Sequence, residues 1–313
     1  MLKTMRIIYF GSDAFGIPSL EELKKKHNLL CVITAPDRPA GRGMKLSSTP
    51  VKIWAIQNNI PTYQPKDISD NEFIKNIKEL SPEFIVLISY GKILPKEIIE
   101  IPSLGAVNVH PSLLPKYRGA APMEWALING EKETGITVIT IKDKVDTGEI
   151  IKQQKVLIDD TDDIFSLRKR LSEVAPFLLL EGLEDIKNGV QPQIQDGTPS
   201  YARRLKKEDG LIRWRKRATD IYNLIRGVKE WPGAYTYLNG KYIKIYTAFP
   251  ILDQKTGRPG EVVGIGHLCI YVACGQGVIK IKELQMEGKR RMSVSEFLNG
   301  HPLKTGDMFS ETR

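Results

Sequence analysis

The chain has 313 residues, of which 41% are hydrophobic and 27% are charged, and its formal net charge is +9. This length fits about two domains that each bury a core, and the composition excludes a disordered or fibrous protein. No apolar run approaches the roughly 20 residues that a membrane-spanning helix needs and no signal peptide is predicted, so we expect a cytoplasmic protein without membrane contact.

Charge is distributed unevenly along the chain. Residues 1–202 contain 25 Lys and Arg against 26 Asp and Glu, whereas residues 203–313 contain 21 against 11. A neutral first part followed by a basic second part indicates two modules, the second of which meets an anionic partner, most commonly nucleic acid. A basic surface that contacts only solvent is the alternative.

Short apolar strands alternate with helical segments in the first part of the chain. Such alternation is typical of a parallel sheet that is covered by helices on both faces. We therefore expect an α/β domain with a largely parallel sheet. Its predicted strands are Arg6–Phe10, Leu29–Thr34, Phe84–Ser89 and Ala106–His110, and its predicted helices are Ala14–Lys26, a run ending at Leu80, and a short helix around Lys96–Glu100.

A β pair and one long helix are predicted to complete this first domain. The pair consists of Thr134–Ile141 and Glu149–Ile158, which are both rich in β-branched residues. The helix is predicted to begin after Thr161 as its N-cap and to run through Lys187 to Gly189. The first domain therefore covers residues 1–189.

The remaining residues predict a linker and a small β-barrel. Residues 190–206 are polar and contain Pro and Gly, which is typical of a linker. Closely spaced strands in residues 207–313, with a hairpin turn at Asn239-Gly240, indicate a small barrel, and Ser293 is spaced from Glu296 as in a capping box. The predicted elements are a helix over Thr219–Val228 and strands over Ala234–Leu238, Lys241–Ala248, Glu261–Gly264, Leu268–Ala273 and Val278–Leu284.

Several common site motifs are absent. The segment Gly11–Gly16 follows the first strand, but Asp13 occupies the second glycine position of a dinucleotide-binding loop and would obstruct a pyrophosphate. The chain also lacks a P-loop, an H-E-x-x-H motif and a G-x-S-x-G elbow. Its three cysteines, Cys31, Cys269 and Cys274, form no C-x-x-C pair, so we expect reduced, buried thiols and no metal site.

One strand end carries residues suited to acyl chemistry. Asn108 and His110 are two residues apart in the predicted strand that ends at Pro111, so they share a face at the edge where parallel sheets bind ligands. An amide donor beside an imidazole can stabilise a carbonyl oxygen that gains negative charge. A structural histidine is the alternative at His110, and an ordinary turn is the alternative for Asp146, which precedes Thr147-Gly148.

A wider pattern resembles the folate-dependent formyltransferases. The segments Asn108–Pro122 and Val145–Gly148 resemble the signature of that family. Ala35–Gly43 and Glu230–Thr236 resemble segments of its members that act on methionyl-tRNA. The likeness covers nearly the whole chain in order; the departures are Glu124, where an amide or imidazole is usual, and Val145, where Leu or Met is usual.

The resemblance implies a Rossmann-like formyltransferase domain followed by an OB-like barrel that binds tRNA. It also implies that 10-formyltetrahydrofolate donates a formyl group to the methionine of initiator methionyl-tRNA, with no metal and no protein partner. The motifs assign Asn108, His110 and Asp146 to catalysis. They assign Ser112, Leu113, Leu114, Pro115, Ser89, Tyr90, Gly91, Lys92, Ile93 and Leu94 to the folate site.

Basic residues outside the motifs are expected to contact tRNA. The stretch Thr34–Val51, rich in Pro and Gly, is predicted as one long loop that is mobile alone and becomes ordered on tRNA. Three clusters in the basic second part are predicted to contact phosphates. The residues assigned to tRNA are Arg38, Arg42, Lys45, Lys206, Lys207, Arg213, Arg215, Lys216, Arg217, Lys289, Arg290 and Arg291.

The predicted chemistry is direct acyl transfer without a covalent enzyme intermediate. Asn108 and His110 would hold the oxyanion, and Asp146 would move the proton from the amine to the departing folate nitrogen. A related enzyme that formylates a sugar nucleotide or a ribosylamine remains an alternative, although such relatives typically carry Arg where Ala120 stands. A non-catalytic RNA-binding protein of the same fold is another.

Overall fold

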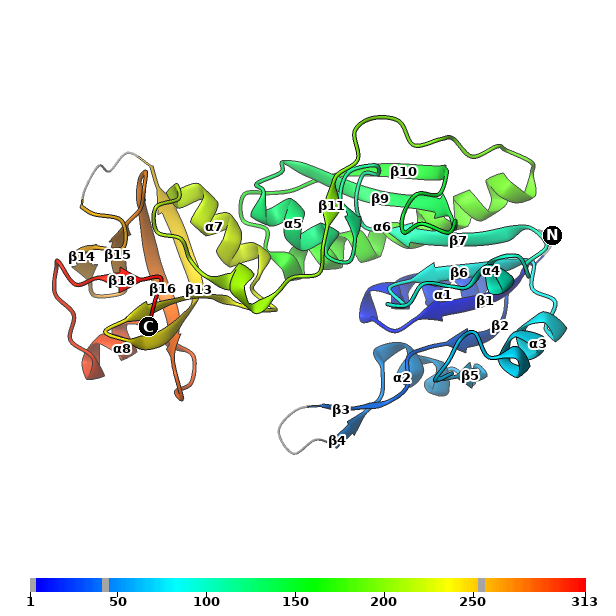
Figure 1. The fold of residues 1–313 in the computed structure, drawn as a ribbon, viewed down its shortest axis with the longest axis horizontal. Coiled ribbons are helices and arrows are strands. Elements are labelled where there is room, and N and C mark those ends of the chain that lie inside the picture. The colour runs from blue at the N-terminus through cyan, green and yellow to red at the C-terminus, as the bar shows by residue number, and fades with distance from the viewer. Residues whose placement is uncertain (1–3, 41–44, 253–256) are drawn as a thin grey trace. The chain divides into compact units, whose positions relative to one another are not determined.

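A computed structural model describes residues 4–40, 45–252 and 257–313 of the chain (Figure 1). Its contacts divide the chain into two compact units. The first consists of Met1–Pro122, Glu133–Leu157 and Arg168–Arg203, and the second of Met123–Lys132, Ile158–Leu167 and Arg204–Arg313.

A seven-stranded sheet forms the centre of the first unit, in the order β10-β9-β7-β6-β1-β2-β5. The five strands from β7 to β5 pair in parallel, whereas β9 and β10 are antiparallel. The expected parallel sheet and β pair are thus confirmed. The bounds are β1 Arg6–Gly11, β2 Asn28–Ile33, β5 Thr62–Tyr63, β6 Phe84–Ile88, β7 Gly105–His110, β9 Glu133–Thr140 and β10 Ile150–Leu157.

Helices cover both faces of this sheet, which explains why β1 is apolar at successive positions. On one face, Phe10 packs in a buried cluster with residues of α3 (Asn71–Glu79) and α4 (Lys96–Ile99). On the other, Tyr9 is fully buried against η1, where a Cβ added at Gly16 would lie 1.8 Å from the Tyr9 hydroxyl oxygen. The other helices of this unit are η1 Ala14–Gly16, α1 Ile17–Lys26 and α2 Pro50–Gln57. Nearly all of α5 (Pro122–Ile128) belongs to the second unit, and α6 (Ile164–Lys187) is divided between the two at Arg168.

Thr161, the expected N-cap of the long helix, does not cap it. The helix α6 begins at Ile164, and the Asp163 carboxylate accepts from the backbone N–H groups of Phe165 at 3.0 Å and Ser166 at 3.1 Å. Asp163 therefore caps the helix, because a carboxylate satisfies two N–H groups that have no partner in the first turn.

The single long loop expected over Thr34–Val51 is also incorrect. Arg38–Ala40 (β3) and Lys45–Ser47 (β4) pair as an antiparallel ribbon that extends away from the sheet in Figure 1. The helix α2 then begins at Pro50, with the Thr49 hydroxyl accepting from the Lys52 backbone N–H at 3.1 Å. Strand pairing and a capping side chain both override the Pro and Gly content.

The second unit is a curled antiparallel sheet in the order β14-β15-β16-β13-β12-β18, with an isolated bridge between Glu261 and Met308 joining its two ends. This agrees with the expected OB-like barrel. The capping box of Ser293 with Glu296 is confirmed at the start of α8. The bounds are α7 Ala218–Gly227, β12 Ala234–Leu238, β13 Lys241–Ile251, β14 Val262–Gly266, β15 Cys269–Ala273, β16 Val278–Met286, β17 Met292–Ser293, α8 Val294–Gly300 and β18 Phe309–Ser310.

The polar segment after α6 is attached to the first unit as far as Arg203. Its strand β11 (Tyr201–Ala202) pairs in parallel with β8 (Arg118–Gly119). Gly119 has φ +123°, and a Cβ there would lie 2.6 Å from the Ala202 carbonyl oxygen. Only glycine therefore permits this close approach of the two backbones.

All three cysteines are buried as expected, and burial raises the pKa of Cys31 and of Cys274 to about 12. Within the described ranges, no helix combines the length and apolar character needed to cross a membrane. In the same ranges, no three His, Cys, Asp or Glu side chains are grouped as metal ligands.

Candidate active site

The last residues of β7 present the two polar side chains of the site. Asn108 aligns with Leu87 of β6 and with Ile139 of β9, so its backbone is fixed on both sides. His110 follows two residues later and is 4% exposed. The two-residue period of the strand thus delivers an amide and an imidazole from the same face.

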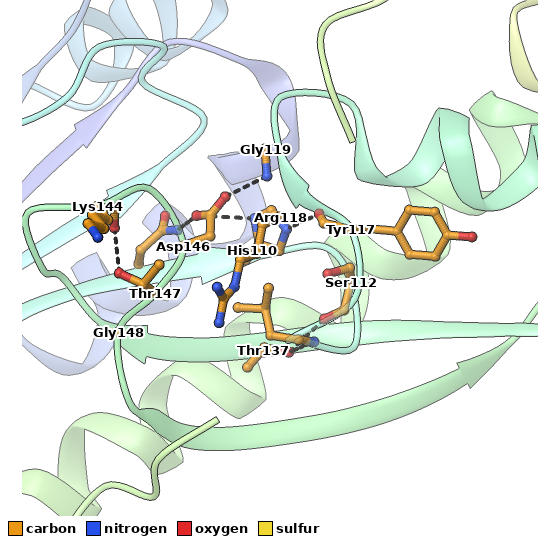
Figure 2. A network of polar contacts seen from close by, with 12 residues as sticks. His110, Ser112, Tyr117, Arg118, Gly119, Thr137, Lys144, Asp146, Thr147 and Gly148 are labelled. Atoms are coloured by element: carbon orange, nitrogen blue, oxygen red, sulfur yellow. Dashed lines mark hydrogen bonds and ion pairs between the residues drawn. The ribbon is translucent and has the colours of Figure 1, made fainter. Parts of the chain in front are cut away.

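Asp146 completes a compact polar network with these residues (Figure 2). Its Oδ1 accepts from Asn108 Nδ2 at 3.3 Å and lies 3.5 Å from His110 Nδ1. Its Oδ2 accepts from the Gly119 backbone N–H at 2.8 Å. The carboxylate is only 8% exposed, so its orientation is determined by these three neighbours. The structure thus brings together the three residues assigned to catalysis.

The environment of His110 determines its tautomer. Its Nε2 lies 2.9 Å from the Tyr117 carbonyl oxygen, and a carbonyl can only accept, so Nε2 carries hydrogen. The other ring nitrogen, Nδ1, faces the Asp146 carboxylate, so the imidazole and the carboxylate are held next to each other.

Gln195 supports the loop that carries Asp146. Its Nε2 donates to the carbonyl oxygens of Asp146 at 2.8 Å and Gly148 at 2.7 Å, and its Oε1 accepts from Arg118 Nη2 at 2.7 Å. Asp146 itself has φ +53°, a backbone conformation that is costly for a residue with a side chain. The role of Gln195 could not be predicted from the sequence, because this residue lies in a segment whose composition indicates only a linker.

Thr137 of β9 organises the segment Ser112–Pro115. Its hydroxyl donates to the Ser112 carbonyl at 2.6 Å and accepts from the Leu114 backbone N–H at 3.2 Å. The Ser112 hydroxyl is buried and donates to the Lys116 carbonyl at 2.7 Å. In this arrangement Ser112 shapes the loop and is not an exposed nucleophile.

A cavity of about 100 Å³ adjoins the polar network. Asn108 and Asp146 line one part of it, and the rest is mostly apolar. Of the segment Ser89–Leu94, only Lys92, Ile93 and Leu94 line this cavity; Tyr90 packs edge-on against Phe10 in the core, with ring centroids 5.3 Å apart. The other lining residues are Leu87, Ile139, Thr140, Ile141, Lys142, Lys144, Val145 and Gly148.

The basic residues assigned to tRNA differ in their surroundings. Four of the arginines pair with carboxylates: Arg213 with Glu311, Arg217 with Asp220, Arg290 with Glu296 and Arg291 with Glu283. Arg42 lies outside the described residues, and Lys45 lies in β4. Arg38, Lys206, Lys207, Arg215, Lys216 and Lys289 are exposed.

Comparison with known proteins places the fold and the site in a class. Residues 5–183 match the formyl transferase family, and residues 204–302 match the C-terminal domain of formyl transferases. The sugar 3N-formyl transferase WlaRD, solved in the presence of dTdp and 5-N-formyl-THF, has the same fold. It superposes with a TM-score of 0.67 at 21% identity, over 92% of this chain and all of that one. The chain therefore has the two domains and the fold of a formyl transferase.

Two named relatives indicate which family of formyl transferases the chain resembles. The methionyl-tRNA formyltransferase of Pelotomaculum thermopropionicum is 45% identical over 98% of this chain and 99% of its own length. That of Syntrophus aciditrophicus is 44% identical over 97% of this chain and 99% of its own. The chain belongs to the methionyl-tRNA formyltransferase family.

Proposed function

We propose that this protein transfers the formyl group of 10-formyltetrahydrofolate to the α-amino group of methionine on initiator methionyl-tRNA, in the cytoplasm. Its similarity to methionyl-tRNA formyltransferases along nearly the whole chain carries the proposal. The geometry of Asn108, His110 and Asp146 supports it, because an acyl transferase needs oxyanion donors beside a proton acceptor.

The cavity beside Asn108 would receive the reacting end of the folate donor. Its apolar side, which includes Ile93 and Ile141, would contact a flat ring system, and its polar side would meet the formyl group. Lys92 lines the cavity, and its Nζ, which donates to the Lys66 carbonyl oxygen at 3.0 Å, would meet a carboxylate of the donor. Ser112–Pro115 and Ser89–Leu94 would together shape the folate site.

The proposed reaction is a direct displacement at the formyl carbon. The neutral amine attacks this carbon, a new C–N bond forms, and the carbonyl oxygen becomes an oxyanion. Asn108 has a second N–H beyond the one given to Asp146, so it can donate to this oxygen, and we assign His110, whose Nδ1 lies 3.5 Å from Asp146 Oδ1, as the second donor. Asp146 accepts the amine proton, directly or through water, and returns it to the folate nitrogen as the old C–N bond breaks.

The two parts of the chain would have different roles in the reaction. We assign residues 1–189 to folate binding and catalysis and residues 207–313 to tRNA binding. Residues 190–206 connect the two, and as far as Arg203 they belong to the first unit. The ribbon of β3 and β4 would reach the acceptor end of the tRNA, and we assign contacts there to Arg38, Lys45 and Arg42, the last of which lies outside the described residues. The exposed basic residues of the second unit would contact phosphates and supply affinity without choosing among tRNAs.

A formyl-transfer assay with charged initiator and charged elongator tRNA tests this function. Asn108→Ala, His110→Ala and Asp146→Ala should each lower kcat by at least about 10², with small changes in KM, because their contacts form mainly in the transition state. His267→Ala, which changes an exposed histidine of the second unit, is the matched control. Normal turnover by the three folded site variants, or equal use of both tRNAs, would contradict the proposal.

A further inference from the structure

An exposed face of the second unit carries a row of aromatic and basic side chains. Across three neighbouring strands, Tyr271 of β15 aligns with Lys280 of β16, which aligns with Phe249 of β13. Residues that are directly opposite in an antiparallel sheet share a face. Their neighbours Ile281 and Ala248 are buried, so this row faces outward.

Lys280 of this row and Lys282, two residues further along β16, each lie over an aromatic ring. Lys280 Nζ is 5.9 Å from the centre of the Tyr271 ring, and Lys282 Nζ is 5.3 Å from that of Phe249. Neither ammonium group has a carboxylate partner among the residues that the structure describes. They differ in this from Arg291, which pairs with Glu283 while lying over Tyr246. The positive charge of the row is therefore available to a ligand.

The row continues to α7. The Tyr222 ring is stacked with that of Phe249, with centroids 6.3 Å apart and planes at 25°. A hollow of about 100 Å³ lies beside these rings. Its two cations are already engaged, since Lys229 pairs with Asp163 at 2.7 Å and the buried Arg226 donates to backbone carbonyls. Phe249, in contrast, is 40% exposed and has Lys282 over its ring.

We propose that this face, consisting of Tyr271, Lys280, Phe249 and Lys282, binds unpaired nucleotides of an RNA by stacking. Rings that alternate with unpaired lysines match a strand whose flat bases alternate with phosphates. The rings on β13 and β15 are two strands apart, about 10 Å, and Lys280 lies midway, where it reaches the phosphate between two stacked bases. The inference rests on the proposed function, in which the RNA is a tRNA, whose loops and acceptor end offer unpaired bases.

The cation–π contacts do not prevent this binding. They are weak at exposed positions, so a base can replace the lysine on the ring while the ammonium group moves to a phosphate. The lysines of the face also differ from Arg213, Arg217, Arg290 and Arg291, which pair with carboxylates. This face is not apparent from the sequence, because Lys280 and Lys282 lie singly in an apolar strand.

Binding of a short fluorescent oligoadenylate to the full-length protein, followed by anisotropy at several salt concentrations, tests the proposal. Phe249→Ala and Tyr271→Ala should each weaken binding about tenfold or more, whereas Phe249→Tyr and Tyr271→Phe should retain it. Lys280→Gln and Lys282→Gln should each reduce the slope of log K against log salt by about 0.7. Phe177→Ala removes a ring that is 64% exposed on α6 and serves as the matched control.

Formylation kinetics separate this proposal from the proposed function. The alanine variants should raise KM for methionyl-tRNA while leaving kcat and the KM of the folate donor unchanged. If the alanine variants bind oligoadenylate as the wild type does, or if Phe177→Ala weakens binding equally, the stacking face is refuted even when formylation is normal. If the wild type does not formylate methionyl-tRNA, the proposed function fails, and the oligoadenylate result still decides whether this face binds RNA.

Discussion

Replacement of Gln195 by leucine is expected to slow the reaction although Gln195 does not reach the reacting atoms. Leucine nearly preserves the volume of the side chain but cannot donate to the carbonyl oxygens of Asp146 and Gly148, which now accept at 2.8 and 2.7 Å. It also removes the acceptor for Arg118. The loop then loses the contacts that hold Asp146 at its positive φ.

The structure sets the size of the effect. Each of the two neutral hydrogen bonds from Gln195 contributes about 1 kcal/mol net, so their loss leaves the position of Asp146 less favourable by about 2 kcal/mol. If this cost falls on the transition state, kcat decreases about thirtyfold, since about 1.4 kcal/mol corresponds to a factor of ten. KM for the folate donor should change little, because Gln195 does not line the cavity.

Steady-state formylation kinetics with saturating tRNA, together with thermal melting, measure this effect. Gln191→Leu is the matched control, because Gln191 lies in the same segment and donates only to the Gly189 carbonyl at 3.2 Å. A Gln195→Leu enzyme with unchanged kcat and unchanged melting temperature would refute the reasoning. So would an equal loss of kcat in Gln191→Leu.

Three further substitutions test a close backbone contact, a buried hydroxyl group and a titrating histidine. Gly148→Ala should lower kcat strongly, since a Cβ there would lie 1.6 Å from the Thr140 carbonyl oxygen, whereas Gly300→Ala, with open space around it, should be neutral in the same assay. Tyr9→Phe should raise the free energy of unfolding by about 1 kcal/mol in denaturant titration, because it removes a buried hydroxyl without a partner. Burial lowers the pKa of His27 below its ordinary value of 6.5, so its contribution to stability is complete above that pH and is lost as the pH falls through the folded-state pKa. His27→Gln should therefore flatten the decrease in melting temperature between neutral and mildly acidic pH, and an unchanged pH profile would contradict this assignment.

Much of the fold could be predicted from local sequence patterns. Continuous apolar runs predicted β1 and β6, because strands that are buried on both faces have no polar side to display. The capping box at Ser293 could be recognised because both its partners lie within four residues. The two-residue period of a strand also sufficed to place Asn108 and His110 on one face, and so to indicate half of the candidate site.

Only the tertiary structure decided which distant groups meet. Nothing local in the sequence indicates that Gln195 holds the loop of Asp146, because the two residues are far apart in the sequence and meet only when the chain folds. Arg213 and Glu311 likewise lie near opposite ends of the sequence of the second unit, yet they form an ion pair. The positive charge of a basic cluster in the sequence is therefore larger than the charge that remains unpaired on the surface. Periodicity reports how one segment is buried, whereas contacts between segments depend on the register and closure of the whole sheet, and these are set by the sum of many weak packing contacts.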